Sequence, residues 1–353
     1  MALDVLEAKK KLDSHIRKQR VLMYKPIQVA EILYQYRLDQ TNLSPLDVNT
    51  YRNPSKRWRD DVTRRLVGRI CTSSARFQDN LFEKNAMPPE VISVLAQENN
   101  SKHGVVEAYI YFRFLERLSM VAKVAKFLRD QDVDTFRLNE LLEIFETEKA
   151  LKKSIDKVYE IVVYSLFHTV IRYLDVEIEL SIKNYDKEML EDFEEFTQLI
   201  LGIDSSSQTR KVNASIYRVG VTNAADKGLD MWTNFGPVVQ VKHITLSPEL
   251  AEDISESINA DEIVIVCKKA EAEIIQLVLS QLGLSRIKGI VTEAQLIEWY
   301  ELCFSKYKNQ MGQYLLESLR REFGEEFPYT DELPLFLEER GYTKDLLTGI
   351  WKP

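Results

Sequence analysis

Three polar residues, Asp230, Gln240 and Lys242, have types and spacing that could do chemistry. Asp230 closes one short apolar stretch, and the other two lie two positions apart in the next stretch, after a turn with Asn234 and Gly236. Because side chains alternate across a strand, Gln240 and Lys242 share one face, and a hairpin brings Asp230 beside them. An acid, a second oxygen ligand and a lysine form a Mg²⁺ site with a cation beside it, which suits phosphodiester hydrolysis.

The local sequence around these residues favours a site over a purely structural role, which is the alternative interpretation of such a common pattern. Gln240 and Lys242 interrupt an otherwise apolar strand. A buried polar group without a partner costs about 1–3 kcal/mol, so both side chains are expected to have partners. Gly228, just before Asp230, allows close backbone approach at the site.

The elements that must position this site form two groups. Helical periodicity dominates the chain up to about residue 175, and alternation typical of half-buried strands starts there. Strands are expected at 175–182, 213–221, 228–233, 237–244, 262–267 and 287–291, with helices at 154–174, 186–202, 248–258, 271–282, 292–304 and 306–322. The fold class is therefore α+β or α/β, with a helical N-terminal region followed by a mixed sheet flanked by helices. We divide the chain into residues 1–135, 136–305 and 306–353, the last a dimer contact or packing element.

The pattern Asp230…Gln240-x-Lys242 resembles the motif of the PD-(D/E)xK nuclease superfamily, although Gln240 replaces the usual acid. The resemblance implies that Asp230, the Gln240 amide oxygen, the Val241 carbonyl and an acid from the preceding helix hold Mg²⁺. Glu160, set in an apolar helix, is the candidate acid, unless it lies at a helix edge and faces water. Lys242 would orient the attacking water and neutralise charge at phosphorus.

Other polar residues near the motif have weaker claims. Asp226 is typical of a turn, and His243 falls on the face opposite Lys242. Three further acids belong to a helix whose composition is typical of a solvated surface: Glu191, Glu194 and Glu195.

A basic segment predicts contact with DNA. Residues 1–130 hold 23 Lys and Arg against 15 Asp and Glu, a net charge of +8, whereas the remaining residues hold 24 and 40, a net charge of −16. Arginine suits bidentate contact with phosphate or guanine, although such runs are also common on solvated surfaces. The candidate DNA-binding residues are Arg52, Lys56, Arg57, Arg59, Arg64, Arg65 and Arg69, with Arg76 nearby.

Composition narrows the class of protein. The 353 residues are 45% hydrophobic and 29% charged, with no apolar run of the roughly 18 residues that a membrane helix needs. The N-terminus does not resemble a secretion signal, and three scattered cysteines indicate a reducing compartment. We therefore expect a cytoplasmic protein without a membrane anchor.

At near full length, the helical first part, Tyr159–Tyr164 and the Asp226–Lys242 stretch look similar to the HaeII-like family of type II restriction endonucleases. This resemblance implies a restriction–modification enzyme that cuts double-stranded DNA with Mg²⁺ at a palindrome with a GCGC core. It also implies a homodimer, because a two-fold DNA site is matched by a two-fold protein.

Two alternatives remain open. The first is a repair or transposon-related nuclease on the same core. The second is a non-catalytic DNA-binding protein whose nuclease core has decayed, since Gln240 already departs from the motif.

Overall fold

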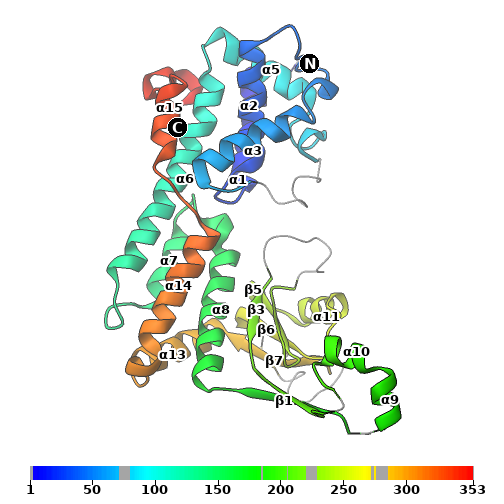
Figure 1. Cartoon of the computed structure of the whole chain (residues 1–353). Coiled ribbons are helices and arrows are strands. Elements are labelled where there is room, and N and C mark those ends of the chain that lie inside the picture. Colours follow the sequence, from blue (N-terminus) through cyan, green and yellow to red (C-terminus); the bar gives the residue numbers. More distant parts are fainter. Residues whose placement is uncertain are drawn as a thin grey trace. The chain divides into compact units, whose positions relative to one another are not determined.

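The computed structural model describes residues 3–70, 80–183, 186–204, 206–219, 229–271, 274–275 and 285–352. The chain forms two compact units. The first contains the described residues up to 158 and those from 320 onward, and the second contains the described residues between 159 and 319 (Figure 1). Of the segment that we separated at residue 306, the described residues up to 319 group with the second unit and those from 320 onward group with the N-terminal helices.

The first unit is helical in its described part, as the 3.6-residue periodicity predicts. Its main helices are α1 (Val5–Lys18), α2 (Tyr24–Leu38), α3 (Pro54–Val67), α5 (Pro89–Ser101), α6 (Val105–Asp130), α7 (Leu138–Thr147) and α15 (Glu332–Glu339). Short helical turns are η1 (Val48–Thr50), η2 (Asn80–Phe82), η3 (Lys152–Ser154), η7 (Lys344–Leu346) and η8 (Gly349–Trp351).

The C-terminal end of helix α5 is rich in polar residues, a composition that is typical of loops, yet it is helical. Asn99 is fully buried there, and its Oδ1 accepts the backbone N–H groups of Val106 and Glu107 at 3.1 and 3.2 Å. These are N–H groups in the first turn of α6, which have no partner within their own helix. The polar side chain therefore starts the next helix.

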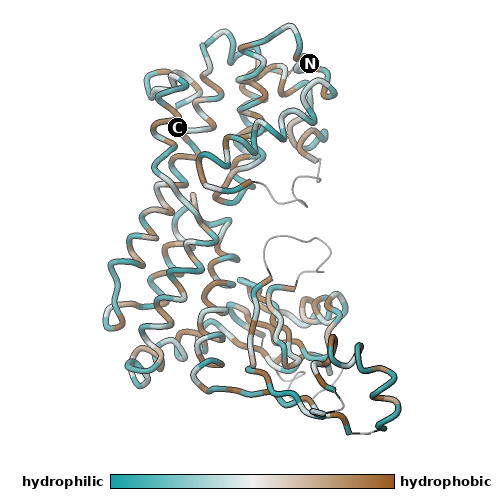
Figure 2. The backbone as a smooth tube through the Cα atoms, in the orientation of Figure 1, coloured by the Kyte–Doolittle hydropathy of each residue, from teal (hydrophilic) through white to brown (hydrophobic). Residues whose placement is uncertain are grey.

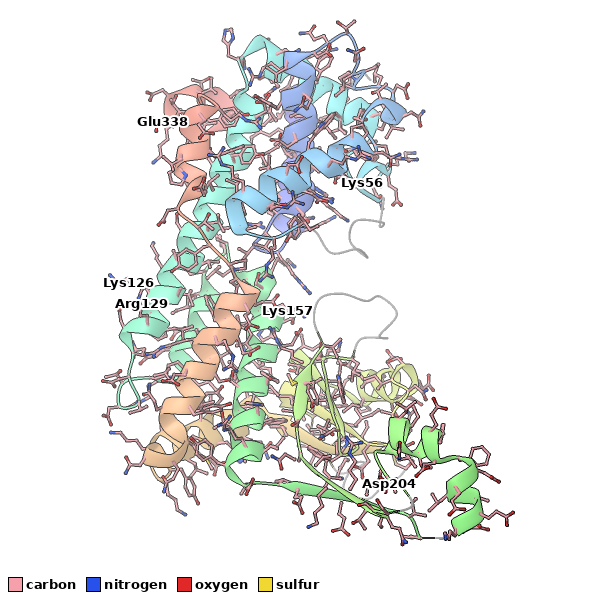
Figure 3. All side chains as sticks on the ribbon, in the orientation of Figure 1. Lys56, Lys126, Arg129, Lys157, Asp204 and Glu338 are labelled. Carbon is pink, nitrogen blue, oxygen red and sulfur yellow. The ribbon has the colours of Figure 1, made fainter. Side chains whose placement is uncertain are left out.

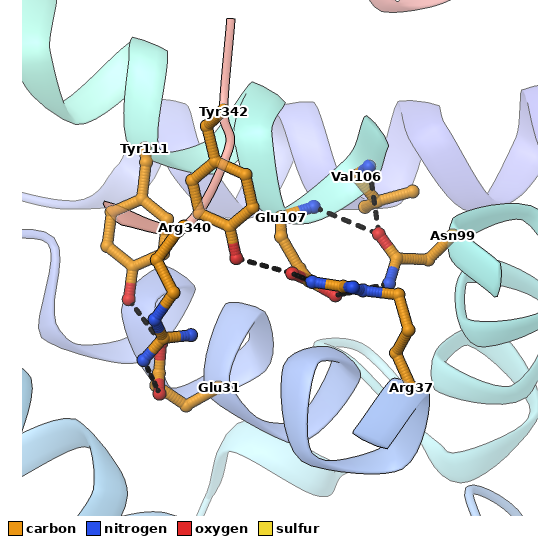
Figure 4. Close-up of polar contacts among 8 residues, drawn as sticks. All are labelled: Glu31, Arg37, Asn99, Val106, Glu107, Tyr111, Arg340 and Tyr342. Atoms are coloured by element: carbon orange, nitrogen blue, oxygen red, sulfur yellow. Dashed lines mark hydrogen bonds and ion pairs between the residues drawn. The ribbon is translucent and has the colours of Figure 1, made fainter. Parts of the chain in front are cut away.

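A buried polar network joins the C-terminal segment to the N-terminal helices (Figure 4). Arg340 pairs with Glu31 of α2 at 3.2 Å, and Tyr342 donates a hydrogen bond to Glu107 of α6. Arg37 also pairs with Glu107, at 2.9 Å. Glu31 and Glu107 are at most 1% exposed, so each carboxylate needs these donors to offset the loss of water.

The second unit holds the sheet that the sequence predicts. Its strands are β1 (Glu177–Ser181), β2 (Thr209–Asn213), β3 (Ile216–Arg218), β4 (Met231–Thr233), β5 (Val238–Leu246), β6 (Ile263–Ala270) and β7 (Ile287–Thr292). Strands β1 and β2 pair separately, and the larger sheet has the order β3-β4-β5-β6-β7. Strand β5 pairs antiparallel with β4 and parallel with β6, so the sheet is mixed and the predicted fold class is confirmed.

The second unit also contains helices and short helical segments. They are α8 (Ile155–Tyr173), α9 (Lys187–Asp192), α10 (Glu194–Phe196), η4 (Thr197–Leu201), α11 (Pro248–Ser257) and α13 (Glu293–Phe304), followed by η6 (Lys308–Gly312) and α14 (Gln313–Glu326), which runs on into the first unit. Helices α8 and α11 lie on opposite sides of the sheet (Figure 1), whose strands carry long hydrophobic stretches (Figure 2).

Side-chain chemistry explains how several of these helices begin and pack. Thr292 caps α13 in a reciprocal capping box with Gln295, as its position in the sequence predicts. In the helix expected at 306–322, Leu315 and Leu319 are buried within the chain. The helix expected at 271–282 lies mostly outside the described residues.

None of the helices in the described ranges is long and apolar enough to cross a bilayer.

Candidate active site

The β4–β5 hairpin places Asp230 opposite Gln240. Met231 pairs with Val239 in the antiparallel register. Asp230, one residue before Met231, therefore lies opposite Gln240, one residue after Val239. The turn needs Gly236, whose φ of 123° disfavours residues with a Cβ. The hairpin predicted from the sequence is therefore present.

The Asp230 carboxylate accepts two hydrogen bonds from β5. Its Oδ2 atom accepts Nε2 of Gln240 at 2.7 Å and the backbone N–H of Val241 at 2.8 Å. Two donors from adjacent residues fix the orientation of the carboxylate. The structure thus brings together Asp230, Gln240 and Val241, three of the four residues assigned to the metal.

Gln240 is the most informative member of this group. Its side chain is only 3% exposed, and the amide oxygen Oε1 is buried without a hydrogen-bond donor among the described residues. The orientation of the amide follows from chemistry, since only the NH₂ group can donate to a carboxylate. Leaving Oε1 unsatisfied costs about 1–3 kcal/mol, and a buried atom of this kind points to an unseen ligand. The donor set therefore fits a hard cation such as Mg²⁺.

Lys242 shares the face of Gln240. Strand β5 pairs with β6 in unbroken register from Val238 to Lys242, and the register shifts only beyond Lys242. The alternation of side chains holds over that span, so the ammonium group is on the same side of the sheet as the amide. The Lys242 side chain is half-buried, and it forms no ion pair within the part of the chain that the structure describes.

The opposite face of β5 is occupied by α8. The rings of Tyr159 and His243 are in contact there, with centroids 4.8 Å apart. Glu160 follows Tyr159 on this helix and is 5% exposed, so it does not lie at a solvated edge. Because α8 and Gln240 are on opposite faces, the role of Glu160 as a metal ligand stays a prediction.

Other acids that the sequence offered are placed less favourably. Glu191 is exposed and pairs with Lys187 at 3.5 Å, which agrees with a solvated helix. Asp226, together with Gly228, lies outside the described residues. Within the described ranges no cluster of three or more His, Cys, Asp or Glu side chains could hold a metal, so amide and carbonyl oxygens are needed to complete any site here.

Helix α3 carries most of the predicted DNA-binding residues, and the structure separates them by environment. Arg59 is 2% exposed, and its guanidinium donates to Asp60 and to Gln28 at 3.0 Å. A buried guanidinium in this position cannot reach a phosphate at the surface. We therefore remove Arg59 from the candidate DNA-binding set.

The remaining cations of this segment are at or near the surface. Arg65 pairs with Glu332 and Glu339, and Arg69 donates to the carbonyl of Glu325, so both are engaged within the helical unit. Lys56 lies on α3 (Figure 3). Arg52, Arg57 and Arg64 are exposed, and Arg76 lies outside the described residues.

Comparisons with known proteins identify the family to which the chain belongs. The sequence model of the HaeII restriction endonuclease family matches residues 8–342. The chain is 46% identical to the type II restriction enzyme HaeII of Haemophilus aegyptius and 48% identical to the type II restriction enzyme NgoBI of Neisseria gonorrhoeae, in each case over 97% of this chain and 98% of the relative. No solved structure matches. The chain belongs to the HaeII restriction endonuclease family.

Proposed function

We propose that this protein is a type II restriction endonuclease that hydrolyses phosphodiesters in both strands of DNA with Mg²⁺. One observation carries the proposal: Asp230 and Gln240 are bonded across the hairpin, and the buried Oε1 atom of Gln240 has no donor among the described residues. The printed names of the two relatives, both type II restriction enzymes, support the reaction class.

The proposed ligands are the Asp230 carboxylate, Oε1 of Gln240 and the Val241 carbonyl, whereas Glu160 lies on α8, which packs against the other face of β5. Held by these residues, Mg²⁺ would supply the Lewis acidity that phosphodiester hydrolysis needs. The Gln240 amide adds no charge, so binding of the cation depends strongly on the Asp230 carboxylate. The two donors on Asp230 hold its carboxylate in place before any substrate arrives.

Lys242 is the proposed cation beside the scissile phosphate. Its ammonium group shares the sheet face of Gln240 and has no ion pair with a described residue. It is therefore available to orient the attacking water and to stabilise the charge that develops on the phosphate oxygens.

The proposed substrate is a palindrome with a GCGC core, an expectation that rests on the family resemblance. A palindrome calls for two copies of the site, and we propose that the protein is a homodimer. An exposed apolar surface on the segment from α9 to η4 supports this proposal. It contains Met189, Phe193, Phe196, Leu199 and Ile200, which are 55–75% exposed. A second copy of the chain, required by the two-fold substrate, is the occupant that we assign to it.

Digestion of a sequenced plasmid with Mg²⁺ tests the function. The wild-type protein should give discrete fragments whose ends map to one palindromic sequence. Lys242→Ala should reduce the single-turnover cleavage rate by about 10²–10³-fold while DNA binding persists. Resection from ends or smears would favour a repair or transposon-related nuclease. The complete absence of cleavage by the wild type, with DNA binding retained, would favour a decayed nuclease core.

A further inference from the structure

A groove in the helical unit concentrates positive charge away from the residues assigned so far. It has a volume of about 1250 Å³ and lies between α6, the connection from α7 to α8, the C-terminal segment and the end of α1. Its lining includes apolar side chains of α6, among them Phe112, Leu115 and Met120. A cavity of this size exceeds the roughly 300–1,000 Å³ typical of a site for one small molecule.

Seven cationic side chains line this groove without an anionic partner among the described residues. Three come from the connection between α7 and α8: Lys149, Lys152 and Lys153. The other four are contributed by α1, α6 and the C-terminal segment: Arg17, Lys123, Lys344 and Lys352. All seven are exposed, so their charged groups can reach a ligand in solution.

The acids of the groove do not compensate for this charge. Among the described residues only two acids line it, Glu116 and Glu148, and Glu116 already pairs with Arg113 at 2.7 Å. Arg117 also contributes to the wall, but it is buried and donates to backbone carbonyls at the end of α1, including Ile16 at 2.6 Å. The groove therefore keeps a large positive excess in a chain whose net charge is −8.

Fold stability does not account for these lysines. Lys152 and Lys153 form the turn η3 immediately before α8, a helix of 19 residues. A helix N-terminus carries partial positive charge, and cations there are unfavourable. The like charges around the groove also repel one another. An arrangement that weakens the free protein in two ways is best explained by an anion that binds there.

We propose that this groove binds the sugar–phosphate backbone of DNA, an interaction that rests on the proposed function but is independent of the catalytic residues. Cationic groups distributed over four segments fit a chain of phosphates better than one compact anion. Lysine acts as a point charge toward phosphate and reads no bases, so the groove contributes affinity and salt dependence without sequence preference. The surface was not evident from the sequence because its cations come from segments far apart along the chain.

The test compares two triple variants of the full chain that remove the same charge. Lys149→Ala, Lys152→Ala and Lys153→Ala are combined in the groove variant. The control combines Lys84→Ala, Lys183→Ala and Lys306→Ala, three exposed lysines outside the groove. Binding to a short mixed-sequence duplex is measured by fluorescence anisotropy without Mg²⁺ between about 50 and 200 mM salt. Thermal unfolding confirms that each variant is folded.

We expect the groove variant to flatten the slope of log K against log salt by about 3, roughly one unit for each phosphate that is no longer neutralised, and the control to leave it within about 1 of the wild type. Equal slopes for the groove variant and the wild type would overturn the proposal, and so would equal flattening by the control. Plasmid digestion by the wild type is scored separately. If the proposed function is wrong, the wild type will not cleave the plasmid. If only the groove proposal is wrong, the wild type will still cleave it.

Discussion

Gln240 and Asp230 are joined across the β4–β5 hairpin by a hydrogen bond of 2.7 Å, in which the amide donates and the carboxylate accepts. This bond directs the amide oxygen away from the acid into a buried position. A glutamine at this position thus does two things that a glutamate could not do together. Its NH₂ group holds the Asp230 carboxylate by a hydrogen bond. Its amide oxygen, which carries no formal charge, remains available to a ligand.

Replacing Gln240 by Glu should therefore make the protein depend on a cation for stability. The variant loses the N–H donor and sets two carboxylates side by side, which we expect to destabilise the metal-free fold by about 1–3 kcal/mol near neutral pH. Added Mg²⁺ should raise the unfolding temperature of Gln240→Glu more than that of the wild type. Gln240→Leu, which has no second oxygen, provides the control and should respond least. Equal Mg²⁺ responses in all three proteins would contradict the assigned ligand.

Asp230→Asn should abolish cleavage at a smaller structural cost than Asp230→Ala. The asparagine oxygen can still accept the N–H of Val241, whereas alanine leaves two donors without their acceptor, at about 1–3 kcal/mol each. Urea unfolding should rank stability as wild type, then Asn, then Ala, and a plasmid assay should find both variants inactive. Residual cutting by Asp230→Asn near the wild-type rate would remove Asp230 from the metal site.

Arg57 and Arg59, two residues apart on α3, should respond in opposite ways to alanine. Arg57 is exposed, so Arg57→Ala should leave stability unchanged and flatten the salt slope of DNA binding by about 1. Arg59→Ala breaks a buried ion pair with Asp60 and should cost about 3–5 kcal/mol in denaturant unfolding. Similar stability losses for the two variants would contradict their different environments.

His15 should make the protein sensitive to acid. Its burial, followed by the charges of Lys25 and Lys18, lowers the pKa of His15 from 6.5 to about 4. Between those values the unfolded chain binds a proton that the folded chain does not, so stability falls as the pH drops from 6.5 to 4, by about 3 kcal/mol in total. His15→Leu should flatten the unfolding free energy across this range, and His103→Asn, an exposed position, should not. A wild-type profile without this slope would refute the shift.

The exposed apolar surface on α9 to η4 should govern assembly. Phe193→Asp combined with Leu199→Asp places charges on the proposed contact and should convert a dimer into a monomer in sedimentation equilibrium. Leu6→Asp with Leu38→Asp changes two exposed leucines elsewhere and should preserve the dimer. A dimer that survives the first pair of substitutions must form through another surface.

The sequence predicts the hairpin of the site because its signals are local. Period-two alternation places Gln240 with Lys242, and a glycine with φ of 123° confirms the turn. Arg59 shows the limit of such reasoning. The same charge pattern that marks Arg57 as a surface cation includes Arg59, whose partner Gln28 is 31 residues away, and only the tertiary fold brings them together.

Local sequence patterns also do not show which segments of the chain make up each unit. The ion pair between Glu31 and Arg340 joins residues 309 positions apart, and the periodicity of neither segment indicates it. For the same reason residues 306–353 resemble an extension in the sequence, while the buried aromatic residues from Phe323 onward belong to the helical unit.

The network at Arg340 and Tyr342 has a consequence for how the protein is made. A ribosome completes the sheet-bearing unit before it has synthesised the residues that fill the helical one. Until Arg340 emerges, Glu31 and Glu107 lack donors that they have in the finished protein, and the helices around them cannot reach their final packing. A nascent chain therefore contains the whole β4–β5 hairpin before the helical unit has all of its residues, so the helical unit is the later of the two to become complete.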